Sequence, residues 1–298
     1  MKCLVTGGAG FVGSNLVDEL IRRGHEVVII DNLSTGKKEH LNPAATFYEV
    51  DIESPDAAQA FVGVDVVFHT AAKARVQPSI EDPLSFNKTN VEGTLNMLKM
   101  AVDNGVKRFV YSASSSAYGN TDKLPQEETD PTNPLSPYGV QKLVGELYST
   151  MFAHVYDIET VSLRYFNIYG ERQSLEGAYC LVMGIFARQK MEGIPLTING
   201  DGQQSRDFTY VGDVVDANIR AATSPLVGNG EVINIGNGDN RSVNQIAAMI
   251  GGEKVHGPPV VEPNSTLADN SQARTLLGWK PTMVIEDWVE KYKEELGI

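Results

Sequence analysis

A tyrosine and a lysine four residues apart form the pair of side chains with the clearest chemical use in this sequence. Tyr138 and Lys142 stand in "SPYGVQK", and a separation of four places both side chains on one face of a helix. A cation beside a phenol favours the phenolate, so we expect Lys142 to lower the pKa of Tyr138 from about 10 toward about 7. A phenolate with that pKa is a useful general base. The alternatives are a core aromatic and a solvent-exposed helix charge.

A cluster of hydroxyl groups precedes that pair in "SASSSAYGN". The cluster ends an apolar run that starts with "RFVY", which predicts a buried strand followed by Ser112, Ser114, Ser115 and Ser116. Ligands bind at the carboxyl ends of strands in parallel sheets. We therefore expect these hydroxyls to meet a ligand, the alternative being serines bonded to the backbone.

A glycine-rich turn, "TGGAGFVG", stands between the first strand-like run and the first helical pattern. Gly7, Gly10 and Gly13 permit a tight turn, close approach of a pyrophosphate and close packing of helix on strand. Asp31 follows some twenty residues on, where a carboxylate accepts hydrogen bonds from an adenosine ribose. It would repel a 2′-phosphate, and "DNLSTG" contains no arginine, so NAD is favoured over NADP. The alternative is a bare turn between strand and helix.

The elements that position these residues alternate along the first half of the chain. Strand-like runs such as "EVVIID", "VDVVFHTAA" and "ETVSLRYF" are separated by helical stretches, and their continuous apolar character is typical of a parallel sheet covered on both faces. After about residue 167 the elements shorten and Gly, Pro and Asn become frequent. We predict an α/β fold with a doubly wound parallel sheet. Residues 1–166 form an NAD-binding Rossmann domain, and residues 167–298 form a smaller α/β substrate lobe from which part of 205–225 returns to the first domain.

The composition excludes several classes of function. A formal net charge of −13 makes nucleic acid an unfavourable partner. No apolar run approaches the ~20 residues that span a bilayer, and the start of the chain does not resemble a signal peptide. Cys3 and Cys180 form no disulfide framework and are interpreted as buried thiols of a cytoplasmic protein. The five histidines show no metal-ligand spacing, so we expect no metal site.

Taken together, the motifs resemble the extended short-chain dehydrogenase/reductase family, and within it the NAD-dependent nucleotide-sugar 4-epimerases that act on UDP-glucose or UDP-N-acetylglucosamine. The motifs in family order are "TGGAGFVG", "DNLSTG", "NVEGT", "SASSSAYG", "YGVQK", "LRYFNIYGERQ" and "GDGQQSRDFTYVGDVV". The resemblance covers essentially the whole chain. It implies that Tyr138 removes the proton of the sugar C4 hydroxyl while hydride passes to NAD, and that both return after the 4-keto sugar turns over.

The resemblance assigns roles residue by residue. Ser114, Tyr138 and Lys142 are the implied catalytic residues. Dehydratases of the family carry Asp-Glu directly after the catalytic Ser or Thr, whereas this chain has Ser115 and Ser116, which favours an epimerase. Besides the glycines and Asp31, the implied NAD contacts are Phe11, Val12, Asn32, Ser34, Thr35, Gly36, Asp51, Ile52, Ala71, Ala72, Asn90, Ser112, Tyr138, Lys142 and Tyr165. For Asp51 the alternative is a surface aspartate.

The implied substrate contacts include one departure from the family. The implied contacts are Ser114, Ser116, Tyr138, Asn167, Thr197, Asn199, Arg206 and Thr266. Arg206 matches the arginine that binds the diphosphate, the alternative being a surface ion pair. A second such arginine is usual, but Pro259 takes its place, although Glu262 fits the acidic position nearby. Arg241 or Arg274 could compensate, so the exact nucleotide sugar stays open.

Two further expectations follow from the resemblance. Thr266 stands where a bulky residue restricts relatives to glucose and galactose, so a small residue predicts acceptance of N-acetyl sugars too; the alternative is that Thr266 never meets the sugar. A homodimer is implied, with helices near 85–102 and from Tyr138 onward forming a four-helix bundle through Leu95, Leu98, Leu143 and Leu147. The open alternatives for function are a C4-reductase, decarboxylase or dehydratase on this fold, or a non-catalytic dinucleotide sensor.

Overall fold

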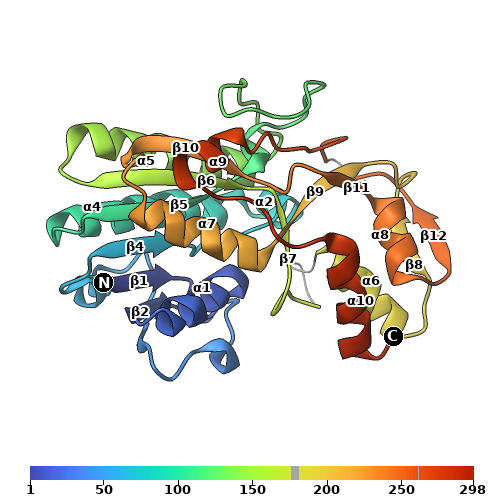
Figure 1. The fold of residues 1–298 in the computed structure, drawn as a ribbon, viewed down its shortest axis with the longest axis horizontal. Helices are drawn as coiled ribbons and strands as arrows, with labels where there is room; N and C mark the ends of the chain where they lie inside the picture. The colour runs from blue at the N-terminus through green and yellow to red at the C-terminus, as the bar shows by residue number, and fades with distance from the viewer. Residues whose placement is uncertain (176–180, 261) are drawn as a thin grey trace.

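Seven parallel strands form the main sheet of the structure (Figure 1). The structure is a computed structural model that describes residues 1–175, 181–260 and 262–298. The central strands are buried along almost their whole length, as their continuous apolar sequences predict. In spatial order the strands are β10 (Asn229–Ile235), β6 (Glu159–Tyr165), β5 (Arg108–Ser114), β4 (Val66–His69), β1 (Lys2–Thr6), β2 (Glu26–Asp31) and β3 (Thr46–Glu49).

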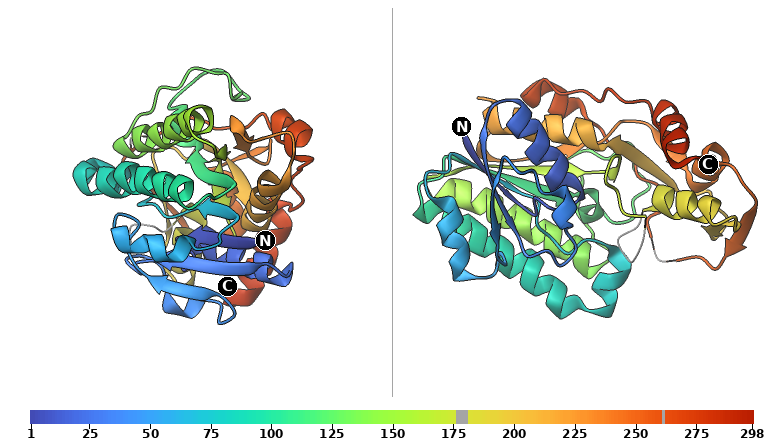
Figure 2. Two further views of the ribbon diagram at one scale, coloured as in Figure 1. Left: turned by 90° about the vertical axis from the view of Figure 1, so that its left-hand side faces the viewer. Right: turned by 90° about the horizontal axis from the view of Figure 1, so that it is seen from below.

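Helices cover both faces of this sheet, as the end-on view shows (Figure 2). Side chains alternate along each strand, so that Cys3 and Val5 join one core and Leu4 joins the other. The helices α1 (Phe11–Arg22), α7 (Val211–Thr223) and α9 (Ser271–Leu277) pack on the first core, and α4 (Thr94–Asp103) and α5 (Pro137–Val155) on the second. The predicted doubly wound α/β fold is confirmed.

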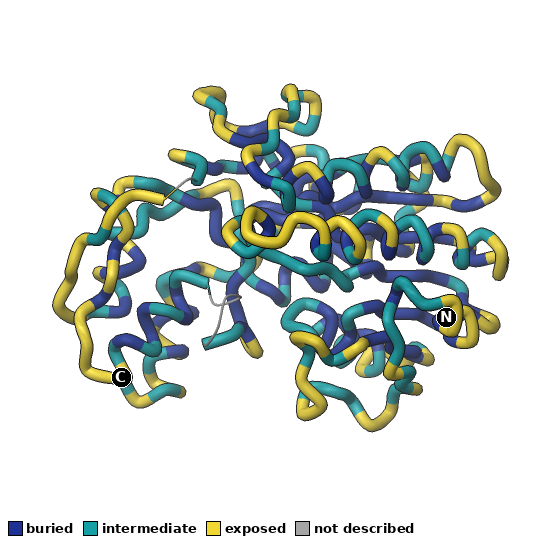
Figure 3. The backbone as a smooth tube through the Cα atoms, turned by 180° about the vertical axis from the view of Figure 1, so that it is seen from behind, coloured by how far each residue is buried: buried dark blue, intermediate teal, exposed yellow. Residues whose placement is uncertain are grey.

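A smaller lobe lies beyond the carboxyl ends of the main strands (Figure 1). It has its own apolar core, in which Phe186, Ile198, Ile246 and Trp288 are buried. Its outer strand is exposed (Figure 3). The lobe contains β7 (Asn167–Tyr169), α6 (Val182–Met191), β8 (Leu196–Asn199), β9 (Ser205–Tyr210), β11 (Asn240–Ser242), α8 (Val243–Ile250), β12 (Lys254–Gly257) and α10 (Ile285–Leu296).

One strand crosses the predicted domain boundary. The division at residues 166 and 167 assigned 226–235 to the smaller lobe, but β10 pairs with β6 at the edge of the main sheet. The helix before it, α7, lies within the segment that we expected to return. The sequence of β10, with Val232, Ile233 and Ile235, is compatible with a strand in either sheet. The strand belongs to the main sheet because Ile233 and Ile235 pack into the larger core.

The helix that carries Tyr138 begins at a well-defined cap. Ser136 is the N-cap, and its hydroxyl accepts a hydrogen bond of 3.1 Å from the backbone N–H of Gly139. Pro137 occupies the first helical position, where its missing N–H costs nothing. The sequence "SPYG" therefore fixes Tyr138 in the first turn of α5, directly against the end of β5.

The helical stretch near 85–102 is interrupted rather than continuous. It consists of α3 (Pro83–Asn87), a π-helical segment η3 (Lys88–Gly93) and α4, and is preceded by α2 (Val76–Glu81). A π-helical turn is common beside functional sites because it turns side chains that a regular α-helix would direct elsewhere. In the part of the chain that the structure describes, 3₁₀ turns form at η1 (Lys38–His40), η2 (Pro55–Phe61) and η4 (Ser115–Ala117).

Two expectations about the whole chain can be compared with the structure. Among the described residues, no helix is both long and apolar enough to cross a membrane. Cys3 is fully buried, and burial raises the pKa of its thiol to about 11, so it is an inert core residue. Cys180 lies outside the described residues. The cytoplasmic location stays a prediction.

Candidate active site

The glycine-rich turn brings backbone close to backbone between β1 and α1. Gly7 has a φ of +71°, and a Cβ at this position would lie 2.8 Å from the backbone of Ala71. A Cβ at Gly13 would clash with the carbonyl oxygen of Gly7. Gly10 is the N-cap of α1 and presents no side chain to the N–H groups of the first turn, which includes Phe11 and Val12. This arrangement fits a pyrophosphate at the N-terminus of a helix.

The carboxylate of Asp31 is held at the end of β2. It accepts hydrogen bonds from the N–H groups of Ala9 (3.0 Å) and Leu33 (2.8 Å). A Cβ on Gly36 would lie 2.9 Å from both carboxylate oxygens, so only glycine fits beside this carboxylate. The oxygens keep lone pairs for a ribose, and together with the glycine turn they suit NAD.

Asn32 links the ends of neighbouring strands. Its side-chain amide donates to the Asp51 carboxylate (2.8 Å), and its side-chain oxygen accepts from the N–H and hydroxyl groups of Ser34. Ser34 and Thr35 are exposed, whereas Ile52 is buried beside Gly93. Asp51 therefore lies beside the predicted adenosine site, and its contact with adenine stays a prediction.

Other predicted NAD contacts already have partners inside the protein. The side chain of Asn90, in η3, accepts a hydrogen bond from the N–H of Lys73 and donates one to its carbonyl oxygen, both at 2.8 Å. The Tyr165 hydroxyl lies 3.1 Å from that of Ser112 and donates to Asn218. The N–H of Ala71 donates to Thr6, and Ala71 and Ala72 are half-buried in the segment after β4. Their contact with the cofactor stays a prediction.

Ser114 and Tyr138 come together where β5 ends and α5 begins. Ser114 also accepts hydrogen bonds from the N–H (3.2 Å) and hydroxyl (2.8 Å) of Ser116. Burial raises the pKa of Tyr138, while a hydrogen bond with the Ser114 side chain and the charge of Arg75 act in the opposite direction. In this structure burial outweighs those two effects, and the expected lowering of the Tyr138 pKa by Lys142 stays a prediction.

Lys142 is buried one turn beyond Tyr138, on the same helix. Its ammonium donates to the carbonyl oxygen of Ser112 (2.8 Å) and lies 5.2 Å from the ring centre of Tyr111. Burial lowers the pKa of Lys142 to about 8, and the charge of Glu146 opposes this shift. The lysine is therefore a cation that loses its proton far more readily than a lysine in water.

A buried ion pair lies beneath that lysine. Glu146 and Arg164 are 3% and 5% exposed, and the carboxylate accepts two hydrogen bonds of 2.9 and 2.8 Å from the guanidinium. The guanidinium also lies 4.6 Å from the ring centre of Tyr118. A bidentate pair is the geometry in which a buried charge is best compensated. Sequence reasoning missed this pair, since neither residue belongs to the hydroxyl cluster or to the Tyr–Lys pair.

The residues predicted to contact a nucleobase lie on β8. Thr197 and Asn199 are exposed, and Thr197 is fixed by Gln189, which bonds to both its N–H and its hydroxyl at 3.0 Å. Asn167 is half-buried at the start of β7, where it pairs with Phe208 on β9. These side chains are accessible for binding, and their contact with a substrate stays a prediction.

Arg206 is paired with a carboxylate in the structure. It is 7% exposed and donates to Glu262 and to the carbonyl oxygen of Ser205. A diphosphate that binds this guanidinium must therefore share it with Glu262 or displace that carboxylate. Arg241, a candidate for the missing second arginine, is bonded to Asp239 and Glu286. The other candidate, Arg274, donates to the side chain of Asn270 (3.0 Å).

Thr266 is buried, with 5% of its surface exposed. Its hydroxyl accepts a hydrogen bond from the N–H of Asp207 (3.2 Å). The Asp207 carboxylate in turn accepts from the N–H groups of Asn237, Gly238 and Ala268. Burial raises the pKa of Asp207 to about 6, against the effect of those three donors. The role of Thr266 as a gate stays a prediction.

Arg75 is a second residue that sequence reasoning missed. It lies on the segment after β4, at a φ of +104°, and its charge acts on Tyr138. The sequence does contain a signal that could have drawn attention to Arg75. In "AAKARV", two cationic side chains follow the end of a predicted strand in an otherwise acidic protein. Its strained backbone conformation had no sequence signal.

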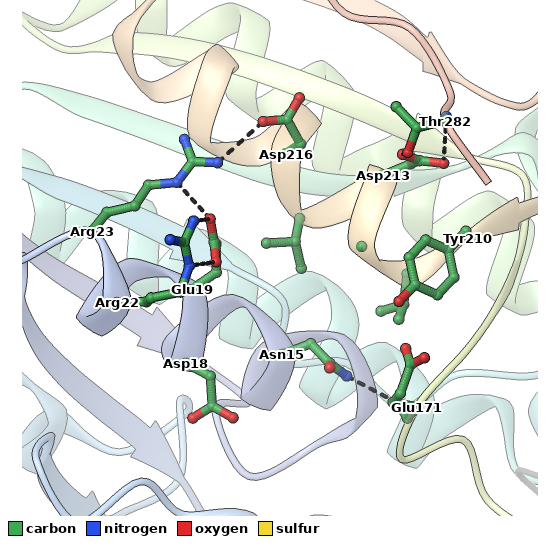
Figure 4. Close-up of a pocket in the computed structure, with 13 residues that line it drawn as sticks. Asn15, Asp18, Glu19, Arg22, Arg23, Glu171, Tyr210, Asp213, Asp216 and Thr282 are labelled. Carbon is green, nitrogen blue, oxygen red and sulfur yellow. Dashed lines mark hydrogen bonds and ion pairs between the residues drawn. The ribbon is translucent and has the colours of Figure 1, made fainter. Parts of the chain in front are cut away.

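A depression of about 460 Å³ on the surface lies apart from these residues, between α1 and α7 (Figure 4). Its carboxylates have structural partners: Glu19 pairs with Arg22 and Arg23, and Asp213 accepts hydrogen bonds from Thr282. Asp18 and Asp216 are likewise engaged in ion pairs within the protein, with Arg172 and Arg220. Within the described ranges no cluster of three or more His, Cys, Asp or Glu side chains could hold a metal ion.

Known proteins resemble this chain over almost its whole length. UDP-glucose 4-epimerase of Mycolicibacterium smegmatis is 35% identical, over 99% of this chain and 98% of its own. The crystal structure of UDP-glucose 4-epimerase with UDP-glucose from Thermotoga maritima superposes with a TM-score of 0.93, at 39% identity, over 99% of this chain and 100% of its own.

A third relative is named for a different sugar. The structure of UDP-N-acetylglucosamine 4-epimerase from Methanobrevibacter ruminantium, in complex with UDP-N-acetylmuramic acid, has a TM-score of 0.92 and 33% identity, over 99% of this chain and 98% of its own. Residues 3–236 match the NAD dependent epimerase/dehydratase family. Because the match covers most of the chain and the relatives are similar over nearly their full length, this chain belongs to that family of NAD-dependent enzymes.

Proposed function

We propose that the protein interconverts UDP-hexoses by NAD-dependent 4-epimerisation through a transient 4-keto sugar. The substrates are UDP-glucose and UDP-galactose, as in galactose metabolism, together with UDP-N-acetylglucosamine and UDP-N-acetylgalactosamine. The observation that carries the proposal is the meeting of Ser114 with Tyr138, one helical turn from the buried Lys142, at the carboxyl end of β5.

Ser114, Tyr138 and Lys142 have different roles in the proposed proton transfer. Ser114 hydrogen-bonds to the reacting oxygen of the sugar and orients it toward Tyr138. The Tyr138 phenolate takes the proton of the C4 hydroxyl and later returns it to the opposite face of the 4-keto sugar. The ammonium of Lys142 supplies positive charge beneath the site. The glycine turn and Asp31 would hold NAD, which when bound would supply the acceptor for the C4 hydride.

The residues next to Ser114 argue against elimination of water. Ser115 and Ser116 form the 3₁₀ turn η4, and the Ser116 hydroxyl is bonded to that of Ser114. Neither serine is acidic enough to protonate a leaving hydroxyl, nor basic enough to remove a proton from carbon. A dehydratase needs such an acid and base beside the sugar, so epimerisation is favoured over dehydration.

The proposed range of sugars rests on Thr266 and on the relatives. A threonine at this place leaves room for an acetamide, whereas an aromatic side chain would clash with one. The relatives are named for both plain and N-acetylated sugars. Comparing wild type with Thr266→Tyr on both pairs of sugars tests the gate: a variant that loses both pairs equally would show that Thr266 acts only through its hydrogen bond to Asp207.

The proposed reaction is tested with purified protein and no added cofactor or reductant. UDP-glucose and UDP-N-acetylglucosamine are incubated separately, and the epimers are resolved by chromatography. We expect both to reach equilibrium with their C4 epimers without net consumption of NAD. Consumption of external NAD(P)H, or accumulation of a 4-keto sugar, would instead indicate a reductase or a dehydratase.

We also propose that the protein is a homodimer. The outer face of α5 carries a shallow apolar groove lined by Val144, Leu147, Tyr148 and Met151, and Leu147 is 63% exposed. An exposed apolar helix face of this kind is suited to packing against a second helix pair. Leu98, which we expected in the interface, is instead fully buried in the core beneath the sheet, so α4 would contribute through other residues.

A further inference from the structure

A buried histidine ends β4, next to the strand that leads into the glycine-rich turn. His69 is 1% exposed, and in the parallel pairing of β1 with β4 it lies opposite Thr6, the last residue of β1. Its ring stacks on that of Tyr111, with the ring centres 6.0 Å apart. The proposed proton transfer does not use this imidazole. A ring buried in this way needs hydrogen-bond partners for both of its nitrogens.

Two threonine hydroxyls bind the ring nitrogens. The Thr6 hydroxyl lies 2.8 Å from Nδ1, and the Thr94 hydroxyl lies 3.0 Å from Nε2. The Thr94 hydroxyl donates its own proton to the carbonyl oxygen of Asn90 (2.8 Å), so its oxygen accepts from the Nε2–H group. Burial lowers the pKa of His69 to about 3, and the charge of Lys142 acts in the same direction, so the ring is neutral. Nδ1 therefore carries no proton and accepts from the Thr6 hydroxyl.

Both ends of this chain of hydrogen bonds reach the same short segment of backbone, residues 71–73. At one end, the oxygen of the Thr6 hydroxyl accepts a hydrogen bond of 3.2 Å from the N–H of Ala71. At the other end, the residue that accepts the threonine proton is Asn90, and its side chain is bonded to the N–H and the carbonyl oxygen of Lys73. The segment is thus held at both ends by groups that converge on one imidazole.

This segment lies directly against the glycine-rich turn. A Cβ on Gly7 would lie 2.8 Å from both the N and the Cα atoms of Ala71, so the two stretches of backbone are in close contact. The Thr70 hydroxyl also donates to the carbonyl oxygen of Thr6 (2.6 Å), which ties the end of β4 to the start of the turn. Because Gly7 belongs to the turn that suits a pyrophosphate, the position of Ala71 affects one wall of the predicted NAD site.

We propose that His69 is a positioning residue for NAD: fixed as the neutral Nε2–H tautomer between two threonine hydroxyls, it holds residues 71–73 against the glycine turn and slows release of the dinucleotide. An imidazole suits this task because one neutral ring accepts at one nitrogen and donates at the other. In the proposed reaction the hydride returns to the sugar, so NAD must stay bound between the two transfers. The inference itself rests on the NAD dependence of the family and not on which sugar is epimerised.

The first experiment compares Thr6→Val with Thr160→Val. Each change removes a fully buried hydroxyl from the main sheet and keeps the shape of the side chain. Thr160 is the matched control, because its hydroxyl donates to the carbonyl oxygen of Ser149 (2.7 Å), outside the chain of bonds around His69. Each protein is loaded with NAD, and the exchange of bound NAD for radiolabelled NAD is followed. We expect Thr6→Val to release NAD about tenfold faster and Thr160→Val to release it at the wild-type rate.

Two substitutions of the histidine separate its two hydrogen bonds. In His69→Asn the amide oxygen lies near the place of Nδ1 and can still accept from Thr6. In His69→Gln the amide N–H lies near the place of Nε2 and can donate only to Thr94. Both variants lose the ring that stacks on Tyr111, so both should be less stable than wild type. We expect NAD release to stay within about threefold of wild type in His69→Asn and to become about tenfold faster in His69→Gln.

A second readout does not depend on turnover. Nitrogen NMR of NAD-loaded protein with isotope-labelled histidine reports the tautomer of each ring, and the signals that vanish in His69→Asn belong to His69. We expect a ring that carries its proton on Nε2 and does not titrate between about pH 5 and 8. If the ring and the NAD exchange behave as expected but no UDP-sugar is epimerised, the proposed reaction fails and the inference about His69 stands.

Three results would overturn the inference. The first is an equal rate of NAD release in Thr6→Val and Thr160→Val. The second is equally fast release in His69→Asn and His69→Gln, which would mean that the ring only fills space. The third is a His69 ring that titrates near neutral pH or carries its proton on Nδ1. If a histidine variant does not fold, the comparison of the two threonine variants still decides.

Discussion

Replacing Glu146 by glutamine removes one charge of a buried pair while keeping the size of the side chain. The guanidinium of Arg164, 5% exposed, then keeps its charge without a carboxylate partner. Breaking a buried pair from one side typically costs about 3–5 kcal/mol, a large part of the roughly 5–15 kcal/mol that stabilises a folded protein. We therefore expect Glu146→Gln to lower the free energy of unfolding by that amount in urea.

The same change acts on the active site through Lys142. Glu146 lies one helical turn away and supports the protonated lysine, whose pKa is about 8. At a separation of about 6 Å and an effective dielectric constant of about 20, the lost attraction is up to ~3 kcal/mol, or roughly two pH units. The pKa of Lys142 should fall below 8, and the alkaline limb of the pH–activity profile should move to lower pH with it.

Two controls separate stability from catalysis. Glu159→Gln breaks a pair whose carboxylate is 56% exposed, and its partner Arg108 keeps three backbone carbonyl acceptors, so the loss should stay below about 1 kcal/mol. Replacing both Glu146 and Arg164 by methionine should recover most of the stability, because no buried charge is left alone, but not the alkaline limb. The reasoning is refuted if Glu146→Gln is no less stable than Glu159→Gln, or if its alkaline limb stays at the wild-type pH.

Three further changes are predicted to have measurable effects. Glu262→Gln frees Arg206, so UDP should bind about tenfold more tightly by calorimetry, which corresponds to ~1.4 kcal/mol; equal or weaker binding contradicts the role of Arg206. Leu147→Glu places a charge in the apolar groove of α5 and should give a monomer in sedimentation velocity, and a dimer that persists rules out this interface. The pKa of Asp207 is about 6 in the fold and 3.8 ordinarily, so the folded state holds more protons between those values. Wild type should lose roughly 2 kcal/mol of stability as pH rises from 4 to 7, whereas Asp207→Asn should show no such loss; parallel urea curves for both proteins would disprove this.

The features that sequence predicts well are local ones. The glycine turn, the apolar strands and the cap before Tyr138 each follow from a few neighbouring residues, because a tight turn, a buried strand and a helix start are decided by adjacent backbone and side-chain chemistry. The spacing of Tyr138 and Lys142 likewise places both side chains on one face of the helix. These elements lie where the sequence indicates.

The features that sequence does not reveal depend on distant partners. Leu98 belongs to an apolar helical pattern that is equally compatible with an interface and with a core. The tertiary structure places it in the core. Glu146 and Arg164 are eighteen residues apart and become a pair because α5 packs on β6. Arg75, with its φ of +104°, lies between Lys73, whose N–H donates to Asn90, and Ser79, whose hydroxyl accepts from the N–H of Tyr138. Each is a consequence of tertiary packing, which the local pattern does not encode.

The central claim is that Tyr138 supports a reversible oxidation at C4 within one closed site. It is tested most directly with UDP-glucose that carries deuterium at C4, incubated with the purified protein in ordinary water. The account predicts that deuterium reappears at C4 of the UDP-galactose formed, with none released to water, and that Tyr138→Phe loses about 10²–10⁴-fold in rate while NAD stays bound. Loss of the deuterium to water, its transfer to C6, or an epimer formed by Tyr138→Phe at the wild-type rate would contradict the account.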